Sequence, residues 1–242
     1  MLNKPLISST PLARRAAILR AAALLAASGA ALPSYALSLA DLTNADASSG
    51  IKAVLTQGAQ VAINQLGQQG GFLNNPQLRI PLPGYLGDAA KLMRRLGQGR
   101  YVDEVEQGIN RAAEAAVPMG KDVLLGAVQS MTVDDAKRIL SGGDNSVTAF
   151  FIGKTRQPLS QRFLPVVTEA TGQVGVVQQY NQLLSKASAF GMSSSGLDLN
   201  QYVTEKTLDG LYTVIAEQER KIRQDPVGSA SAVVRKVFGA IQ

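Results

Sequence analysis

Apolar residues recur at intervals of three and four along nearly all of this chain after residue 48. This spacing puts them on one face of an α-helix, whereas a half-buried strand needs alternating apolar and polar residues, and no convincing run of that kind occurs. We therefore predict an all-α fold, a compact multi-helix bundle-like domain. The spacing predicts helical segments within 51–66, 102–116, 123–128, 132–140, 146–151, 159–167, 176–187, 208–222 and 233–241. The charged residues of the 208–222 segment are predicted to be solvated; they are Glu217, Glu219, Arg220, Lys221 and Arg223.

Capping residues and prolines mark several helix ends. Thr132 opens the sequence Thr-Val-Asp-Asp, in which the Thr132 hydroxyl accepts from a first-turn amide and the Asp135 carboxylate reaches back. This is the pattern of a capping box. Asp144 or Ser146 is placed to cap the helix that follows. Pro165 lies inside an apolar stripe, so we expect a kink or a new helix start there.

The first 36 residues have the three parts of a secretory signal peptide. A basic region without acidic residues precedes an apolar run at 21–32, which is too short to span a bilayer. Small residues then stand before two possible cleavage points, after Ala36 and after Ala40. We expect a cleavable signal over 1–36, a flexible mature N-terminus over 37–47, and a single all-helical domain over 48–242. The alternative interpretation of the apolar run is an uncleaved anchor or a buried core helix.

Export would place the mature chain in the periplasm, either soluble or peripherally associated with a membrane. It would also remove much of the net charge, which is +6 for the whole chain. Without the four basic residues of the signal the net charge falls to +2; those residues are Lys4, Arg14, Arg15 and Arg20. A nucleic-acid binder would collect its basic residues on one face of the folded domain, so we predict no nucleic-acid partner.

The chain has no cysteine and no histidine. Disulfides and a lipidated N-terminal cysteine are therefore excluded. Most transition-metal sites are excluded as well, because imidazole and thiolate are their usual ligands. Nucleophilic catalysis by Ser-His-Asp or Cys-His arrangements is also impossible. We predict no metal site, no cofactor and no catalytic residue.

One stretch, from about 68 to 84, does not follow the helical pattern. It contains an Asn-Pro turn signal and an Ile-Pro-Leu-Pro sequence, which must be extended because proline disfavours helix at the preceding residue. Its apolar residues favour a segment laid over helix ends to cover the core. A lid or a partner-docking segment is the alternative, since long loops in compact domains are often functional. The candidate binding residues of this loop are Phe72, Asn74, Asn75, Ile80 and Leu82.

Several irregular motifs carry a resemblance to a known family. They are Gly71–Pro76, Ile80–Pro83, Asn110–Glu114, Met131–Ala136, Tyr202–Lys206, Asp209–Leu211, Ile222–Arg223 and Val237–Gly239. In these segments the chain resembles the bacterial family named domain of unknown function 4197, over about residues 51–239. The resemblance implies an exported helical protein, and it brings no activity, cofactor or catalytic residue with it.

Charged side chains supply the remaining candidate binding residues. Lys154 and Arg156 follow two phenylalanines and can hold an anionic head group, although basic residues in the last turn of a helix also suit its dipole. Arg111 and Glu114 lie on one predicted helix, within the family-like sequence Asn110–Glu114.

Two sets of acidic residues offer acid–base chemistry, because offsets of three or four residues place side chains along one flank of a helix. Asp103, Glu106, Asn110 and Glu114 follow one flank by such offsets, and Glu205 and Asp209 are one turn apart. The candidate catalytic pairs are Glu106 with Glu114, and Glu205 with Asp209. Such pairs can catalyse hydrolysis when one pKa is raised. The simpler interpretation is a solvated face or structural salt bridges, with Arg111 and Lys206 close enough to neutralise the acids.

The sequence thus favours a non-enzymatic binding protein of the cell envelope, with either a partner protein or an apolar small molecule as its ligand. One alternative is a hydrolase or lyase that uses the carboxylate pairs. The other is a peripheral membrane protein that docks through its C-terminal helices, where Arg235 and Lys236 stand among apolar residues. The oligomeric state stays open.

Overall fold

The computed structural model describes residues 44–173, 175–189 and 198–225. All of them lie in a compact unit, Leu37–Gln242, that is separate from Met1–Ala36. The expected signal peptide, the segment 191–196, which its glycines and three serines predict to be a loop, and the expected helix at 233–241 lie outside the described residues. The first described helix begins at Asn44, four residues before the predicted start of the helical domain.

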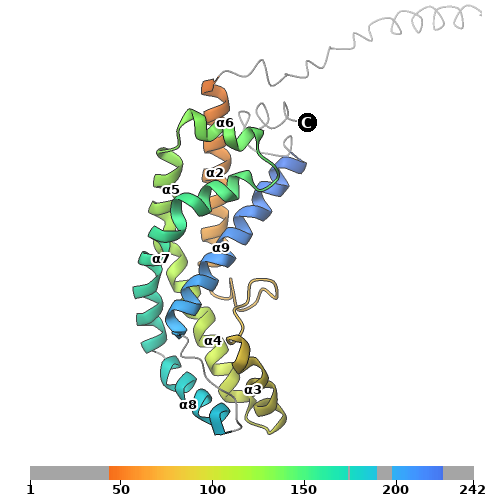
Figure 1. The fold of residues 1–242 in the computed structure, drawn as a ribbon, viewed down its shortest axis with the longest axis vertical. Helices are drawn as coiled ribbons and strands as arrows, with labels where there is room; N and C mark the ends of the chain where they lie inside the picture. Colours follow the sequence, from red (N-terminus) through yellow and green to blue (C-terminus); the bar gives the residue numbers. More distant parts are fainter. Residues whose placement is uncertain (1–43, 174, 190–197, 226–242) are drawn as a thin grey trace, which may run out of the picture. The chain divides into compact units, whose positions relative to one another are not determined.

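Every regular element in the described ranges is a helix, which confirms the predicted all-α class (Figure 1). The elements are α2 (Asn44–Leu66), α3 (Gly84–Arg95), α4 (Gly99–Ala116), the 3-10 turn η2 (Val117–Gly120), α5 (Lys121–Gln129), α6 (Val133–Ser141), α7 (Ser146–Gln173), α8 (Val176–Ala189) and α9 (Leu199–Gln224).

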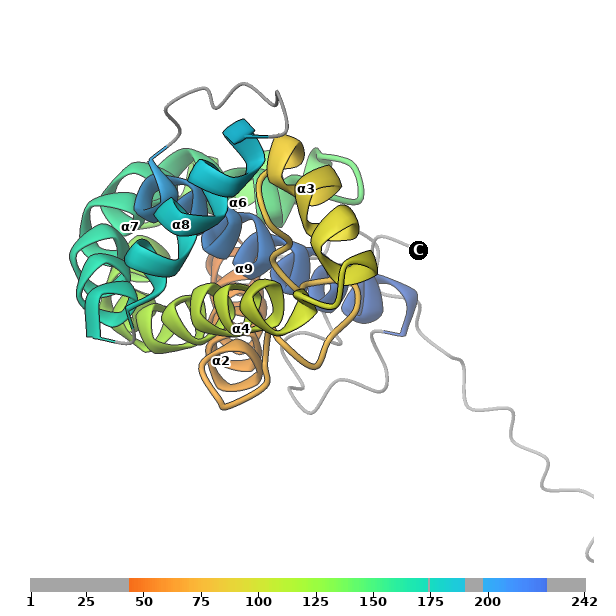
Figure 2. The ribbon, with the colours of Figure 1, turned by 90° about the horizontal axis from the view of Figure 1, so that it is seen from below.

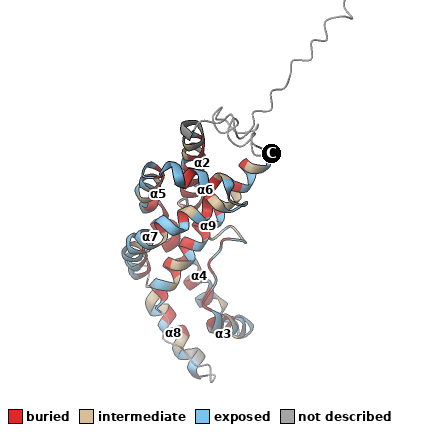
Figure 3. Cartoon of the chain, turned by 45° about the horizontal axis from the view of Figure 1, so that its top comes forward, coloured by how far each residue is buried: buried red, intermediate tan, exposed pale blue. Residues whose placement is uncertain are grey.

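The core is built around α9. This helix packs against α7, α2 and α4, and Figure 2 shows it surrounded by these three helices. Buried residues follow the sides where the helices face one another (Figure 3). On α9 these residues include Leu208, Leu211 and Ile215, which show the spacing that predicted a helix over 208–222. The hydrophobic effect along these faces therefore holds the bundle together.

Two apolar stripes expected as separate segments, 146–151 and 159–167, belong to the single helix α7. Pro158 and Pro165 both lie inside it, and each removes a backbone N–H donor from the helical ladder. Figure 1 shows that α7 changes direction along its length, as prolines inside a helix cause. The helix continues past Pro165, so the expectation that a new helix starts at this proline is wrong.

Helix α3 was not predicted. Its buried residues Leu86, Ala89, Ala90 and Met93 do have helical spacing. Two of the four are alanines, however, and the helix directly follows the proline-rich extended stretch, so the apolar signal was weak. The prolines end at Pro83, and α3 starts at the next residue.

Between α2 and α3 runs a non-helical segment, residues 67–83, which we call the strap. Four of its apolar side chains are buried in the core, namely Phe72, Leu78, Ile80 and Leu82. Phe72 lies so close to α9 that a Cβ added at Gly210 would stand 2.5 Å from the ring. Glycine at this position therefore lets the strap approach α9.

Candidate functional site

A buried carboxylate on α4 holds the first half of the strap. One oxygen of Glu114 accepts hydrogen bonds from the backbone amides of Phe72 and Leu73, both at 3.1 Å. Glu114 is 5% exposed, Phe72 is fully buried and Leu73 is partly buried, so the Phe72 amide is shielded from bulk water and the Leu73 amide is partly shielded. A buried amide needs an acceptor, and Glu114 supplies it.

Asn110, one turn earlier on α4, holds the second half of the strap. Its side-chain amide accepts from the Ile80 backbone N–H at 2.8 Å and donates to the Ile80 carbonyl at 2.9 Å. Tyr202 of α9 adds a third anchor, because its hydroxyl donates to the Pro81 carbonyl at 2.9 Å. Burial raises the pKa of the Tyr202 hydroxyl, which keeps the donor protonated.

The structure therefore separates the candidate residues of the strap into two groups. Phe72, Ile80 and Leu82 are core residues, and each is at most 4% exposed. Asn75 accepts from the Gln77 amide at 3.0 Å within a turn, and Asn74 is exposed. These contacts favour the strap as a cover for the core, and binding of a partner by these residues stays a prediction.

The two carboxylates of the first pair, Glu106 and Glu114, have different partners. Glu114 holds strap amides, as described above, whereas Glu106 forms ion pairs with Arg79 at 2.8 Å and Arg94 at 3.2 Å. Arg111 is exposed and forms no ion pair with a described residue, so the expectation that it neutralises these acids is wrong. The partners come from the strap and α3, which the sequence could not place beside α4.

The second pair, Glu205 and Asp209, is bridged by Arg156 of α7. Lys206 also pairs with Asp209, at 3.4 Å, as expected from the sequence. Arg156 lies in the wall of a shallow cavity of about 530 Å³ between α7 and α9. Both acids thus have structural ion-pair partners in this arrangement.

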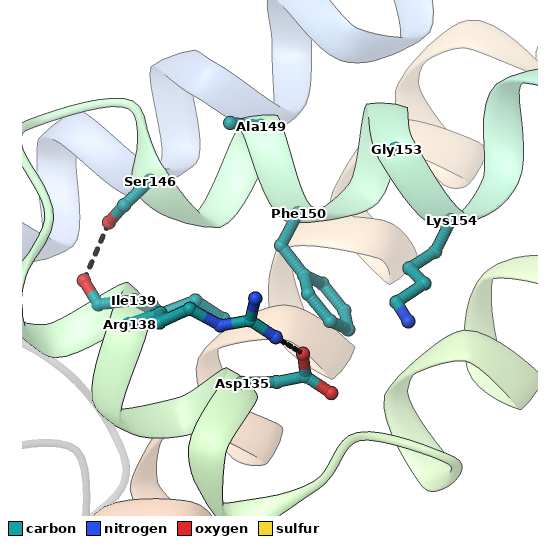
Figure 4. A pocket seen from close by; sticks show the side chains of 8 residues that line it. All are labelled: Asp135, Arg138, Ile139, Ser146, Ala149, Phe150, Gly153 and Lys154. Carbon is teal, nitrogen blue, oxygen red and sulfur yellow. Dashed lines mark hydrogen bonds and ion pairs between the residues drawn. The ribbon is translucent and has the colours of Figure 1, made fainter.

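A second cavity, of about 460 Å³, lies between α6 and α7 (Figure 4). We call it the α6–α7 pocket. Its lining residues are Asp135, Arg138, Ile139, Ser146, Ala149, Phe150, Gly153 and Lys154. Of these, only Lys154 was a candidate from sequence. Ile139 and Phe150 lie in two segments that the sequence predicts to be helical, 132–140 and 146–151, but nothing in the sequence showed that these helices enclose a pocket.

Two contacts fix the walls of this pocket. The capping box at the start of α6 forms as predicted, with the Thr132 side chain accepting from the Asp135 amide at 3.1 Å. The Ser146 hydroxyl at the start of α7 donates to the Ile139 carbonyl at 2.7 Å, so it joins α6 to α7 instead of capping its own helix.

The charged residues around the pocket differ in how many partners they have. Asp135 accepts from the Thr132 amide at 3.1 Å and hydroxyl at 2.8 Å and pairs with Arg138, and these interactions lower the pKa of its carboxyl. Lys154, by contrast, forms no hydrogen bond or ion pair with a residue that the structure describes, although its charge acts on the Asp135 carboxyl and helps to lower its pKa. Two cations and one anion line the pocket, so it carries a net positive charge.

The lowered pKa of Asp135 predicts a pH-dependent contribution to stability. Asp135→Asn should lower the free energy of unfolding at neutral pH by about 1 kcal/mol, since asparagine keeps an acceptor but loses the charge. Because the folded pKa is below the ordinary value of 3.8, the wild-type advantage is complete above that pH. It should disappear as the pH falls through the folded pKa. Urea unfolding of both proteins across acidic pH measures this; a difference that persists at the lowest pH would contradict it.

Within the described ranges, no cluster of three or more acidic side chains is placed to hold a metal ion. None of the helices there combines the length and apolar character needed to cross a bilayer. The part of the chain that the structure describes is an all-α bundle with two notable features. They are the strap, whose apolar side chains enter the core, and the α6–α7 pocket, which carries a net positive charge.

The family follows from the sequence comparison. Residues 41–239 match the family described as Protein of unknown function (DUF4197), and the chain belongs to this family. This confirms the resemblance seen in the motifs. No curated protein and no solved structure matches the chain.

Proposed function

We propose that this chain is an exported, non-enzymatic binding protein of the bacterial cell envelope, and that its α6–α7 pocket binds a small amphiphile with one acidic group. The N-terminal segment supports export, through its basic region, apolar run and small residues before Ala36. The absence of histidine and cysteine from the sequence supports a binding role over nucleophilic catalysis.

The observation that carries the proposal is Lys154 at the mouth of a partly apolar cavity. Figure 4 shows its ammonium group on one side of the Phe150 ring and the Arg138 guanidinium on the other. Arg138 is already paired with Asp135, so Lys154 is the cation available to an acidic ligand. Phe150 and Ile139 offer apolar contact beside it. A volume of about 460 Å³ lies within the range of small-molecule sites.

A fluorescence titration with anilinonaphthalene sulfonate tests the proposal, because this probe joins an aromatic body to one sulfonate. We expect saturable binding to the unit Leu37–Gln242. Lys154→Glu should weaken binding at least about tenfold, since it removes the attracting charge and adds a repelling one. Gly153→Leu should weaken it as well, because the open space beside Gly153 would be filled.

The matched control is Lys121→Glu, which makes the same charge change at an exposed residue of α5. It should bind the probe as the wild type does. If Lys154→Glu and Gly153→Leu both kept wild-type affinity, or if Lys121→Glu weakened binding equally, the pocket would not be the binding site.

A further inference from the structure

Three charged side chains line the α6–α7 pocket, namely Asp135 and Arg138 of α6 and Lys154 of α7. Asp135 and Arg138 form an ion pair, whereas Lys154 has no ion-pair partner among the described residues. An acidic ligand therefore meets one cation that can neutralise it directly. One cation balances one negative charge, and a second negative charge on the same ligand needs another partner.

The Asp135 carboxylate cannot turn away from such a ligand. Its side chain is only 7% exposed, and both Thr132 and Arg138 bond to it. Figure 4 shows the carboxylate between Arg138 and Lys154, and the charge of Lys154 acts on it. Hydrogen bonds from Thr132 are the main reason that its pKa is lowered below 3.8, so this carboxylate is negative at neutral pH. A fixed negative charge thus stands beside the available cation.

Arg138 is not free to balance a second negative charge. Its side chain is 76% exposed and can move, but the Asp135 side chain with which it pairs is buried. If Arg138 turned to the ligand, Asp135 would lose its ion-pair partner, and a buried charge without a partner is costly. Arg223 donates to the Ser146 hydroxyl in the pocket wall, but it also pairs with Glu219, so these two residues of α9 together add no net charge.

We infer that the α6–α7 pocket accepts acidic groups that carry one negative charge and discriminates against those that carry two, and that Asp135 sets this limit. Carboxylates, sulfonates and phosphodiesters belong to the accepted class, whereas a phosphomonoester carries nearly two charges above neutral pH. The second charge would lie beside the Asp135 carboxylate, where repulsion between like charges opposes binding. This inference rests on the proposed function, since it specifies the ligand of the same pocket.

Two ligands with the same alkyl chain, octyl sulfonate and octyl phosphate, test this limit. Calorimetric titration of the unit Leu37–Gln242 at mildly alkaline pH should give an affinity for the sulfonate at least about tenfold higher than for the phosphate. Asp135→Asn should raise the affinity for the phosphate by about tenfold and change the affinity for the sulfonate less. The matched control, Asp134→Asn, removes the exposed neighbouring carboxylate from the same first turn of α6 and should keep the wild-type preference.

A pH series with the wild type tests the same limit without a substitution. Octyl phosphate gains its second charge as the pH rises from about 5 to about 8, because the second pKa of a phosphomonoester is about 6. Its affinity should fall by about tenfold over this range, whereas the affinity for octyl sulfonate, which keeps one charge, should not change. If Asp135→Asn does not fold, this series alone decides the inference.

The outcomes separate this inference from the proposed function. If both ligands bind the wild type equally well at mildly alkaline pH, the inference is overturned and the proposed function stands. The same holds if Asp135→Asn folds and keeps the full preference for the sulfonate, because Asp135 then does not set the limit. If neither ligand binds, the proposed function and the inference fail together.

Discussion

Glu114→Ala should lower the free energy of unfolding by about 3 kcal/mol or more, because each buried donor left without an acceptor costs about 1–3 kcal/mol. The two donors are the amides of Phe72 and Leu73, which both bond to one Glu114 oxygen. The structure gives these two amides no other acceptor among the described residues, and the full burial of Phe72 limits replacement by water at its amide. Urea unfolding followed by circular dichroism measures the loss.

Two variants make this result specific. Glu114→Gln keeps an oxygen in place for both amides, so it should cost much less than Glu114→Ala. Glu169→Ala removes an exposed glutamate on α7 and should change stability by no more than about 0.5 kcal/mol. If Glu114→Gln were as damaging as Glu114→Ala, charge and not acceptance from the strap would be the important property of this residue.

The destabilisation caused by Glu114→Ala should also begin in one part of the molecule. Hydrogen exchange in Glu114→Ala should rise first in the first half of the strap, which loses its anchor. The second half should change less, because Asn110 and Tyr202 still hold it. A uniform rise across all helices would instead indicate that Glu114 stabilises the bundle as a whole. The comparison separates a local clamp from a general contribution to the core.

The strap shows what local patterns in this sequence can and cannot predict. Prolines at positions 81 and 83 fix the backbone of 80–83 as extended, and the apolar residues predict burial, so its course as a cover was foreseeable. The residues that anchor the strap could not be foreseen from the sequence. Asn110 and Glu114 are 30 to 42 residues away from the amides they accept from, and only the folded chain brings them together.

The same limit applies to the α6–α7 pocket. The capping box of α6 was predictable because Thr132 and Asp135 are three residues apart. Lys154 could be selected as a cation able to hold an anionic group, from its place after two phenylalanines. Asp135 and Arg138 form a local pair, three residues apart on α6. That this pair lies beside Lys154 depends on how α6 packs on α7, which the periodicity along one helix does not show.

Glu219 is the clearest error of the sequence-based interpretation. Its charged neighbours on α9 predicted a solvated side chain, yet it is 2% exposed. Glu219 accepts from the backbone amides of Val147 and Thr148, both at 3.0 Å, and from the Thr148 hydroxyl at 2.8 Å. The first amides of α7 are thus capped by a carboxylate from α9, not by Asp144 or Ser146 as expected. A negative charge at a helix N-terminus also suits the helix dipole.

Glu219→Ala should therefore lower the free energy of unfolding by about 3–5 kcal/mol, because it removes one partner of a buried charge pair as well as the cap of α7. The Arg223 guanidinium contacts Glu219 at 3.1 Å and its side chain is only 14% exposed, so it would lose a carboxylate partner. Urea unfolding measures the change. The control Glu217→Ala replaces a neighbouring glutamate that is less buried on the same helix and should cost far less.

A double-mutant cycle with Arg223→Ala separates the two contributions. If most of the cost comes from the Arg223 guanidinium losing its contact with the Glu219 carboxylate, the double variant should be more stable than Glu219→Ala alone. If the double variant is less stable, the orphaned amides of α7 dominate. Because α7 forms a wall of the α6–α7 pocket, Glu219→Ala should also weaken binding of the sulfonate probe, although Glu219 does not line the pocket. Unchanged stability together with unchanged binding would show that α7 does not need this carboxylate.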